Sequence, residues 1–199
     1  MEFKYYDLLS NIIVGYFTMM AYLYALGIDY NEDYAVAYIA AAYVLGYVIN
    51  AVSSMMEGFW YKTIGGMPSN NLLTLKEGKE YTGTDKIRFY DGEEAIKKLK
   101  AELNDPNASI GKMFGRAMSY SNGNKDCRVP VFNANYVFSR VLLTAVTFVT
   151  VALIVSSSSD WRVYLIIPIW YICWRRFKER GYYYAREVLI EYLKQNRDS

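Results

Sequence analysis

The chain has 199 residues, of which 53% are apolar and 17% aromatic, and it carries a formal net charge of +2. So small a charge gives no indication of a nucleic-acid partner. The sequence has no histidine, which excludes Ser-His-Asp and Cys-His catalysis and the usual zinc sites. The two cysteines, Cys127 and Cys173, are too few for a disulfide framework.

The apolar residues are gathered in blocks, and this segregation indicates a membrane protein. The first block runs from Leu8 to Ile28 and has no charge over 21 residues. A signal peptide is the competing interpretation. However, the residues before the block hold one lysine beside two acids, and no good small-residue cleavage site follows it. We therefore expect a retained membrane helix.

The second block, from Tyr34 to Met56, has 23 uncharged residues, and a helix needs about 20 to cross a bilayer core of about 30 Å. Small residues recur in it at helical spacing and would let another helix approach closely: Ala37, Ala41, Ala42 and Gly46. We expect this face to pack on other membrane helices and to support a homo-oligomer, so that Gly46→Leu would break the assembly. The short connection between the two blocks makes residues 1–61 a transmembrane hairpin.

Residues 62–130 are expected to form a water-soluble insert. Two strand-like runs around Gly83 predict a small hairpin. A helix is predicted over Asp91–Leu103, with Asp91 as its cap, and a second one over Ile110–Tyr120. The insert would then be a small α+β unit. Its thin core would lean on the membrane helices or on a neighbouring subunit.

Residues 131–174 hold a second hydrophobic hairpin. Its first helix is expected to start near Val131, and its second, Val163–Trp174, has only 12 residues and contains Pro168. This last segment alone is too short to span a bilayer. Snorkelling of the flanking arginines would complete a fourth span, and a re-entrant or interfacial segment is the alternative. Residues 175–199 follow as an amphipathic helical tail, whose apolar stripe consists of Ala185, Val188, Leu189 and Tyr192.

The distribution of lysine and arginine predicts the topology. Glu57–Arg140 contains 13 such residues and the tail from Arg175 contains 7, whereas the connections Asp29–Asp33 and Asp160–Arg162 contain none and one. Both termini and the insert are therefore expected on the cytoplasmic side of the inner membrane. The expected fold class is mainly α: a four-helix transmembrane bundle of two hairpins, with the α+β insert and the helical tail.

Polar residues inside the apolar blocks are candidate functional positions, because such groups are costly in a membrane and either pair or line a water path. A polar seam or gate would consist of Asn11, Tyr16, Tyr43 and Asn50. Ordinary helix–helix hydrogen bonding is the alternative. Glu57 and Arg140 flank the second and third hydrophobic helices at one level and are predicted to form an interfacial ion pair.

A basic cluster follows the fourth block and consists of Arg175, Arg176, Lys178 and Arg180. Contact with anionic lipid and the positive-inside rule explain it, and contact with a partner, a nucleic acid or a nucleotide is the sharper alternative. The sequence has no phosphate-binding glycine motif and no recognisable nucleophile–base spacing. We therefore expect neither an enzyme nor a bound metal or cofactor.

Three stretches carry a resemblance: DLLSNIIVGY (Asp7–Tyr16), FNANYVFSR (Phe132–Arg140) and FKERGYYYAREVLIEYL (Phe177–Leu193). They resemble small four-span integral membrane proteins of bacteria, some of which are encoded beside type VI CRISPR nucleases or in other anti-phage loci. Many of those proteins have a Pro-Gly pair where this chain has Val14-Gly15. The resemblance does not extend to the insert and brings no catalytic residues. The lack of histidine also separates this chain from accessory proteins with a HEPN-like Arg…His motif.

The resemblance and the topology together imply an oligomeric membrane effector or accessory protein of a defence system, which alters membrane permeability when a cytoplasmic partner or signal acts on the insert and tail. The alternative is a non-conducting membrane adaptor that anchors or regulates a soluble partner enzyme.

Overall fold

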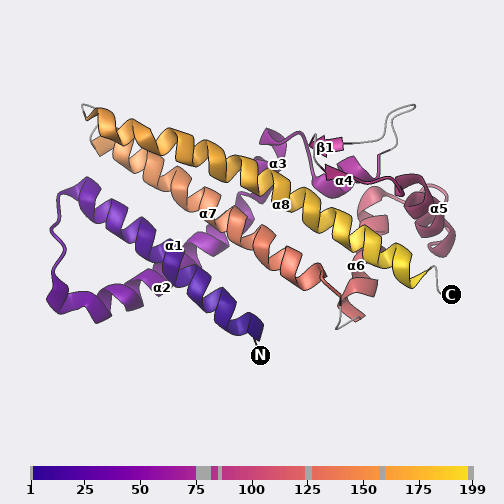
Figure 1. Cartoon of the computed structure of the whole chain (residues 1–199), viewed down its shortest axis with the longest axis horizontal. Coiled ribbons are helices and arrows are strands. Elements are labelled where there is room, and N and C mark those ends of the chain that lie inside the picture. The colour runs from indigo at the N-terminus through magenta and orange to yellow at the C-terminus, as the bar shows by residue number, and fades with distance from the viewer. Residues whose placement is uncertain (1, 75–81, 85–86, 124–126, 157–159, 197–199) are drawn as a thin grey trace. The chain divides into compact units, whose positions relative to one another are not determined.

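The structure is a computed structural model and describes residues 2–74, 82–84, 87–123, 127–156 and 160–196. These residues are mainly helical, as the sequence predicts (Figure 1). The α-helices are α1 (Glu2–Leu26), α2 (Ala35–Met55), α3 (Glu57–Thr63), α4 (Pro68–Leu72), α5 (Gly92–Glu102), α6 (Ile110–Gly123), α7 (Val129–Ser156) and α8 (Ile166–Gln195). Two short 3-10 helices are η1 (Glu32–Tyr34) and η2 (Trp161–Leu165).

The chain divides into two compact units. We call the first the span unit, which consists of Met1–Gly58 and Val137–Phe177, and the second the head unit, which consists of Phe59–Tyr136 and Lys178–Ser199. Helices α7 and α8 each contribute residues to both units.

Three helical segments among the described residues are long and apolar enough to cross a membrane: Leu8–Leu26, Glu32–Met55 and Val129–Ser156. The third includes Pro130 in its first turn, where the missing N–H of proline is not needed. The predicted fourth block forms η2 and the start of α8. Because α8 changes from apolar to charged residues at Arg175, its apolar part is shorter than a bilayer core is thick. The fourth span therefore stays a prediction.

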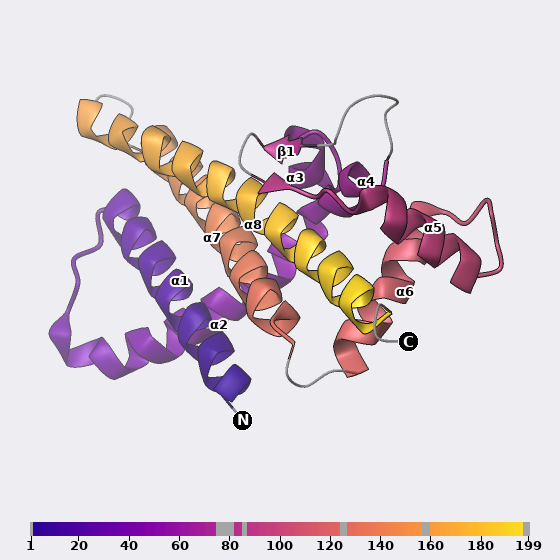
Figure 2. The ribbon, with the colours of Figure 1, turned by 45° about the vertical axis from the view of Figure 1, so that its right-hand side comes forward.

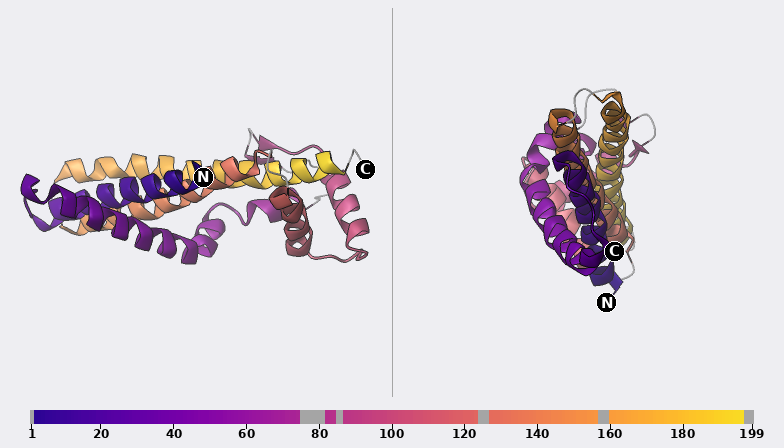
Figure 3. Two further views of the ribbon diagram at one scale, coloured as in Figure 1. Left: turned by 90° about the horizontal axis from the view of Figure 1, so that it is seen from below. Right: turned by 90° about the vertical axis from the view of Figure 1, so that its left-hand side faces the viewer.

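Helices α1 and α2 cross each other (Figures 1 and 3). Their backbones approach closely at two glycines, Gly15 and Gly46. A Cβ atom on Gly15 would overlap the carbonyl oxygen of Ala42 and would lie 2.7 Å from the backbone nitrogen of Gly46. A Cβ atom on Gly46 would overlap the carbonyl oxygen of Asn11. This is the close approach that small residues at a four-residue spacing permit between membrane helices.

The small residues of α2 thus fall into two groups. Ala42 and Gly46 are buried against α1 within the same chain, whereas Ala37 and Ala41 are exposed. A Gly46→Leu substitution would therefore act first on the packing inside one chain, so it cannot serve as a clean test of the oligomer. The exposed pair remains available for contact with another helix.

Helix α7 packs on this crossing inside the span unit. Val14 of α1, Ile49 of α2, and Val141 and Ala145 of α7 form one buried apolar cluster. Next to it, the indole Nε1 of Trp170 in α8 donates a hydrogen bond of 2.9 Å to the hydroxyl of Thr147 in α7, and the two helices run side by side there (Figure 2). A tryptophan N–H buried in apolar surroundings needs such a partner, so the bond fixes the register of α8 on α7.

The head unit has its own core, in which the stripe of the C-terminal tail is central. Ala185, Val188, Leu189 and Tyr192 are all buried there, against apolar side chains of α5 and α6 such as Leu99 and Met113. The apolar stripe of the tail thus packs on the insert. Asp91 lies at the N-cap position of α5, but its side chain makes no capping hydrogen bond, so that detail of the prediction is wrong.

Two short strands, β1 (Thr82–Thr84) and β2 (Ile87–Arg88), pair antiparallel, with Thr82 opposite Arg88. A small hairpin is thus present as predicted, but Gly83 lies within β1 and not between the two strands. Residues 85–86 and the run 75–81 lie outside the described residues. Because the described part of the insert is otherwise helical, its α+β character stays a prediction.

The glycine crossing leads to a first prediction. Gly46→Ala should destabilise the protein by about 1–3 kcal/mol, because the added methyl group meets backbone atoms that cannot rotate away. Gly58→Ala is the matched control, since a Cβ atom there has nothing within 4 Å and alanine favours a helix over glycine. Thermal unfolding in detergent micelles measures both. Equal melting temperatures for the two variants would contradict the crossing.

Candidate functional site

The most strongly buried charge described in the span unit belongs to Arg140 on α7. Its side chain is only 9% exposed, and its Nη1 lies 3.1 Å from the carboxylate Oε2 of Glu57, whose side chain is 29% exposed. The Nη2 of Arg140 also donates a hydrogen bond of 2.7 Å to the hydroxyl of Ser54. The ion pair that the sequence predicts is therefore present, with a serine as a further partner.

This polar cluster joins α7 to the junction of α2 and α3. Helix α2 ends at Met55 and α3 begins at Glu57, so Glu57 lies in the first turn of α3, where the helix dipole favours a carboxylate. Ser54 belongs to the last turn of α2. A single guanidinium group thus holds the end of one helix and the start of the next, which can fix the angle between them.

The four residues of the predicted polar seam lie in different settings. Asn11 is buried where its backbone meets Gly46, Tyr16 and Asn50 are half-buried, and Tyr43 is exposed. Among the described residues no hydrogen bond joins any two of the four. The seam or gate stays a prediction.

The basic cluster lies on α8, with Arg175 and Arg176 in the span unit and Lys178 and Arg180 in the head unit. Arg175 and Arg176 are exposed, whereas Lys178 and Arg180 are half-buried. Two exposed guanidinium groups that follow an apolar segment suit contact with anionic headgroups. The structure therefore leaves both interpretations of this cluster open, the lipid contact and the partner contact.

A second polar cluster, which sequence reasoning missed, lies in the head unit around Glu102 at the end of α5. Its carboxylate accepts hydrogen bonds from Tyr120 of α6 at 2.7 Å and from Tyr192 of α8 at 3.0 Å, and it pairs with Arg116 of α6 at 2.5 Å. The rings of Tyr120 and Tyr192 also meet edge to face, 5.3 Å apart. One side chain thus connects three helices, and no local spacing in the sequence signals it.

The environment of Glu102 shifts its titration. Burial raises the pKa of this carboxyl, but the hydrogen bonds from Tyr120, Arg116 and Tyr192 outweigh burial and hold its pKa below the ordinary value of 4.5. Burial and the bond to Glu102 also raise the pKa of Tyr192. The carboxylate is therefore charged and fully engaged at neutral pH. Such a group stabilises a structure and is not available as an acid or base.

Comparison with known protein families, with curated proteins and with solved structures finds no match for this chain. Among the described residues no group of three or more histidine, cysteine, aspartate or glutamate side chains could hold a metal ion. The function must therefore be argued from the polar cluster, the helix crossing and the shared helices.

A double-mutant cycle tests the cluster around Arg140. Glu57→Gln removes the counter-charge of a buried guanidinium group. Removing one partner of a fully buried ion pair lowers the free energy of unfolding by about 3–5 kcal/mol. Because Glu57 is partly exposed, we expect a smaller loss of about 1–3 kcal/mol. Adding Arg140→Met should restore part of that loss, since no charge then stays buried. Thermal unfolding in detergent gives the coupling energy. Strictly additive effects would mean that the ion pair contributes nothing.

Replacing Glu102 should lower the stability of the protein and weaken the dependence of that stability on acidic pH. Hydrogen bonds to a charged group contribute about 1.5–3 kcal/mol, so we expect Glu102→Gln to lose roughly that amount. The folded-state pKa of Glu102 lies below its unfolded value, so its stabilisation is present above pH 4.5 and is lost as the pH falls through the lower folded-state value.

Melting temperatures of the full chain measured from pH 7 to pH 3 check this. The wild type should lose stability more steeply below pH 4.5 than Glu102→Gln does. Glu93→Gln, an exposed carboxylate on the same helix, is the control and should follow the wild type. A Glu102→Gln profile parallel to that of the wild type would contradict the assignment.

Proposed function

We propose that this chain is an integral protein of the bacterial inner membrane that acts as an oligomeric effector or accessory protein. A cytoplasmic partner or signal acts on the head unit, and the span unit changes the permeability of the membrane in response. The proposal places both termini and the head unit on the cytoplasmic side, as the count of basic residues predicts.

The shared helices carry this proposal. Helices α7 (Val129–Ser156) and α8 (Ile166–Gln195) pass from the span unit to the head unit without an interruption. A domain that is only tethered needs no more than a flexible linker, whereas a continuous helix passes a rotation or shift at one end to the other end. Two such helices support a protein in which the head unit acts on the membrane helices.

The polar cluster around Arg140 would respond to such a movement. Arg140 is the fourth residue of the span unit on α7, and Glu57 is the next-to-last residue of the segment that ends at Gly58. A shift of α7 would thus stretch or release the ion pair and change how α2 continues into α3. Packed interfaces of this kind change between discrete arrangements rather than deforming continuously.

A conducting path would need several copies of the chain. The exposed face of α2 includes Ala37 and Ala41, which suit close contact with a helix of a neighbouring copy. The role in anti-phage defence rests on the resemblance of Asp7–Tyr16, Phe132–Arg140 and Phe177–Leu193 to membrane proteins of such loci. Plating phage on cells that express the chain with its neighbouring genes would test that role.

A non-conducting adaptor is the second candidate, and the surface of the span unit favours it. Many exposed side chains of the three apolar helices are aliphatic or aromatic, including Ile13, Phe17, Val36, Val44, Val151 and Val155. Such side chains suit contact with lipid rather than with a water-filled path. An adaptor would bind its partner through the head unit without any ion flux.

Leakage from liposomes that contain the purified full chain separates the two candidates. The effector predicts release of an encapsulated dye and of ions, and it predicts that Arg140→Ala and Asn50→Leu change the release by about tenfold, which corresponds to about 1.4 kcal/mol in a gating equilibrium. Lys97→Ala, an exposed charge on α5, is the control and should leave the leakage unchanged.

Tight liposomes, both alone and with the products of the neighbouring genes, would contradict the effector. Cross-linking of the head unit to a soluble protein in those cells, in the absence of any leakage, would then support the adaptor.

A further inference from the structure

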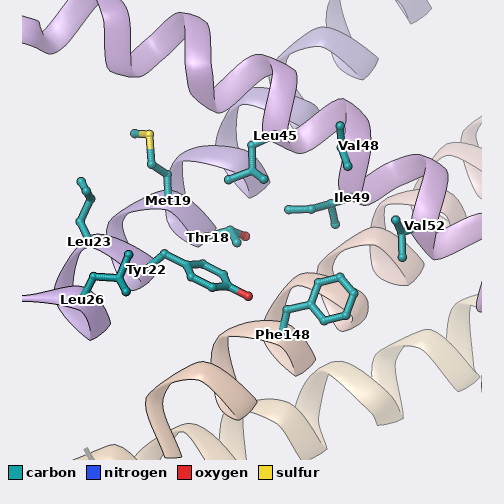
Figure 4. Close-up of a pocket in the computed structure, with 10 residues that line it drawn as sticks. All are labelled: Thr18, Met19, Tyr22, Leu23, Leu26, Leu45, Val48, Ile49, Val52 and Phe148. Atoms are coloured by element: carbon teal, nitrogen blue, oxygen red, sulfur yellow. The ribbon is translucent and has the colours of Figure 1, made fainter. Parts of the chain in front are cut away.

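The span unit contains a partly open cavity of about 310 Å³ between α1, α2 and α7 (Figure 4). Its wall is formed by ten side chains from these three helices: Thr18, Met19, Tyr22, Leu23, Leu26, Leu45, Val48, Ile49, Val52 and Phe148. Figure 4 shows Tyr22 and Phe148 facing each other across the space.

The glycine crossing explains why the space exists. Gly15 and Gly46 bring the two backbones into contact at one point, and beyond that point the two helices diverge, because close contact along their whole length would require small side chains throughout. On α1 the wall starts at Thr18, one turn after Gly15, and on α2 it lies around and after Gly46. Phe148 of α7 closes the third side.

Water is a poor occupant of this cavity. The hydroxyl of Thr18 donates a hydrogen bond of 2.8 Å to the backbone carbonyl of Val14 in its own helix. Tyr22 then supplies the one remaining side-chain hydroxyl among the lining residues. An ordered water needs two to four polar partners, and this lining supplies fewer than that. An apolar molecule is therefore the chemical class that the lining suits.

The helices around the cavity indicate which apolar molecule could bind there. The three helices that line the cavity are those whose length and composition suit a membrane span. When these helices lie in a membrane, the hydrocarbon of the lipids is the apolar material that surrounds them. Ligand pockets in proteins have volumes of about 300–1,000 Å³, and a space at the lower end of that range admits part of one chain and not a whole lipid.

We infer that the cavity binds one acyl chain of a membrane phospholipid, held between α1, α2 and Phe148. The lining contacts the chain and offers no charge to a headgroup, so the site selects for a hydrocarbon chain and not for a particular headgroup. The inference requires that the span unit lies in a membrane. It does not require that the protein conducts ions or binds a cytoplasmic partner.

Native mass spectrometry of the full chain, extracted in a mild detergent and washed, tests the inference. The wild type should retain one phospholipid per chain, with phosphatidylethanolamine and phosphatidylglycerol bound in proportion to their abundance. The double variant Val48→Phe/Val52→Phe fills the cavity and should reduce the lipid-bound fraction at least tenfold.

The matched control is Val36→Phe/Val44→Phe, which makes the same two changes on the same helix. Val36 is 82% exposed and Val44 is 60% exposed, and neither lines the cavity. This control should retain the lipid as the wild type does. Equal lipid retention in both double variants, or no retained lipid in the wild type, would overturn the inference. So would an adduct with the mass of a free fatty acid, or a lipid-free dimer in which a second copy fills the space.

A second measurement needs no variant and so does not depend on the folding of one. A phospholipid with a photoreactive diazirine near the end of its acyl chain is incorporated into nanodiscs with the wild-type protein, and the cross-linked peptides are mapped. Labels should concentrate at least fivefold on Thr18–Leu26 and Leu45–Val52 relative to the exposed residues Val151 and Val155. Uniform labelling of all lipid-facing residues would show ordinary boundary lipid and would overturn the inference.

Discussion

The backbone contact between α1 and α2 is the constraint on which the span unit depends. Lipid chains are as apolar as leucine, so membrane helices gain little from hydrophobic burial and associate through close packing and polar contacts. Gly15 and Gly46 supply that close packing, since either Cβ atom would overlap the opposite backbone. The buried cluster with α7 includes Val14, the neighbour of Gly15, and the wall of the cavity starts at Thr18, one turn further along α1.

The two polar clusters, around Arg140 and around Glu102, have the same design in different surroundings. Each places one charged group at the meeting point of helices that are distant in the sequence, with an opposite charge and one or two hydroxyl groups as partners. Burying a charge is costly unless it is paired and hydrogen-bonded. These clusters therefore fix which helices meet, while the apolar residues around them supply most of the favourable burial.

Local patterns in the sequence predict the helical class, the helix positions and the buried stripe of the tail, because these depend on hydrophobic periodicity and on turn residues. Glu57 and Arg140 were also predictable as a pair, since two opposite charges flank apolar blocks at one level. The packing partner of Gly46 could not be predicted, because a face of small residues does not tell whether the helix that packs on it belongs to the same chain. The cluster around Glu102 depends on Tyr120 and Tyr192, which are brought together only by the tertiary fold.

The discontinuous head unit has a consequence for the order of events during synthesis. Its core contains residues from Leu72 onwards and also Val188, Leu189 and Tyr192 of α8, which leave the ribosome only after α7 has been made. Domains generally fold as units during translation, but this one stays incomplete until its last helix emerges. The head unit can therefore adopt its final form only after all three of the described helices that are long and apolar enough to cross a membrane have been made.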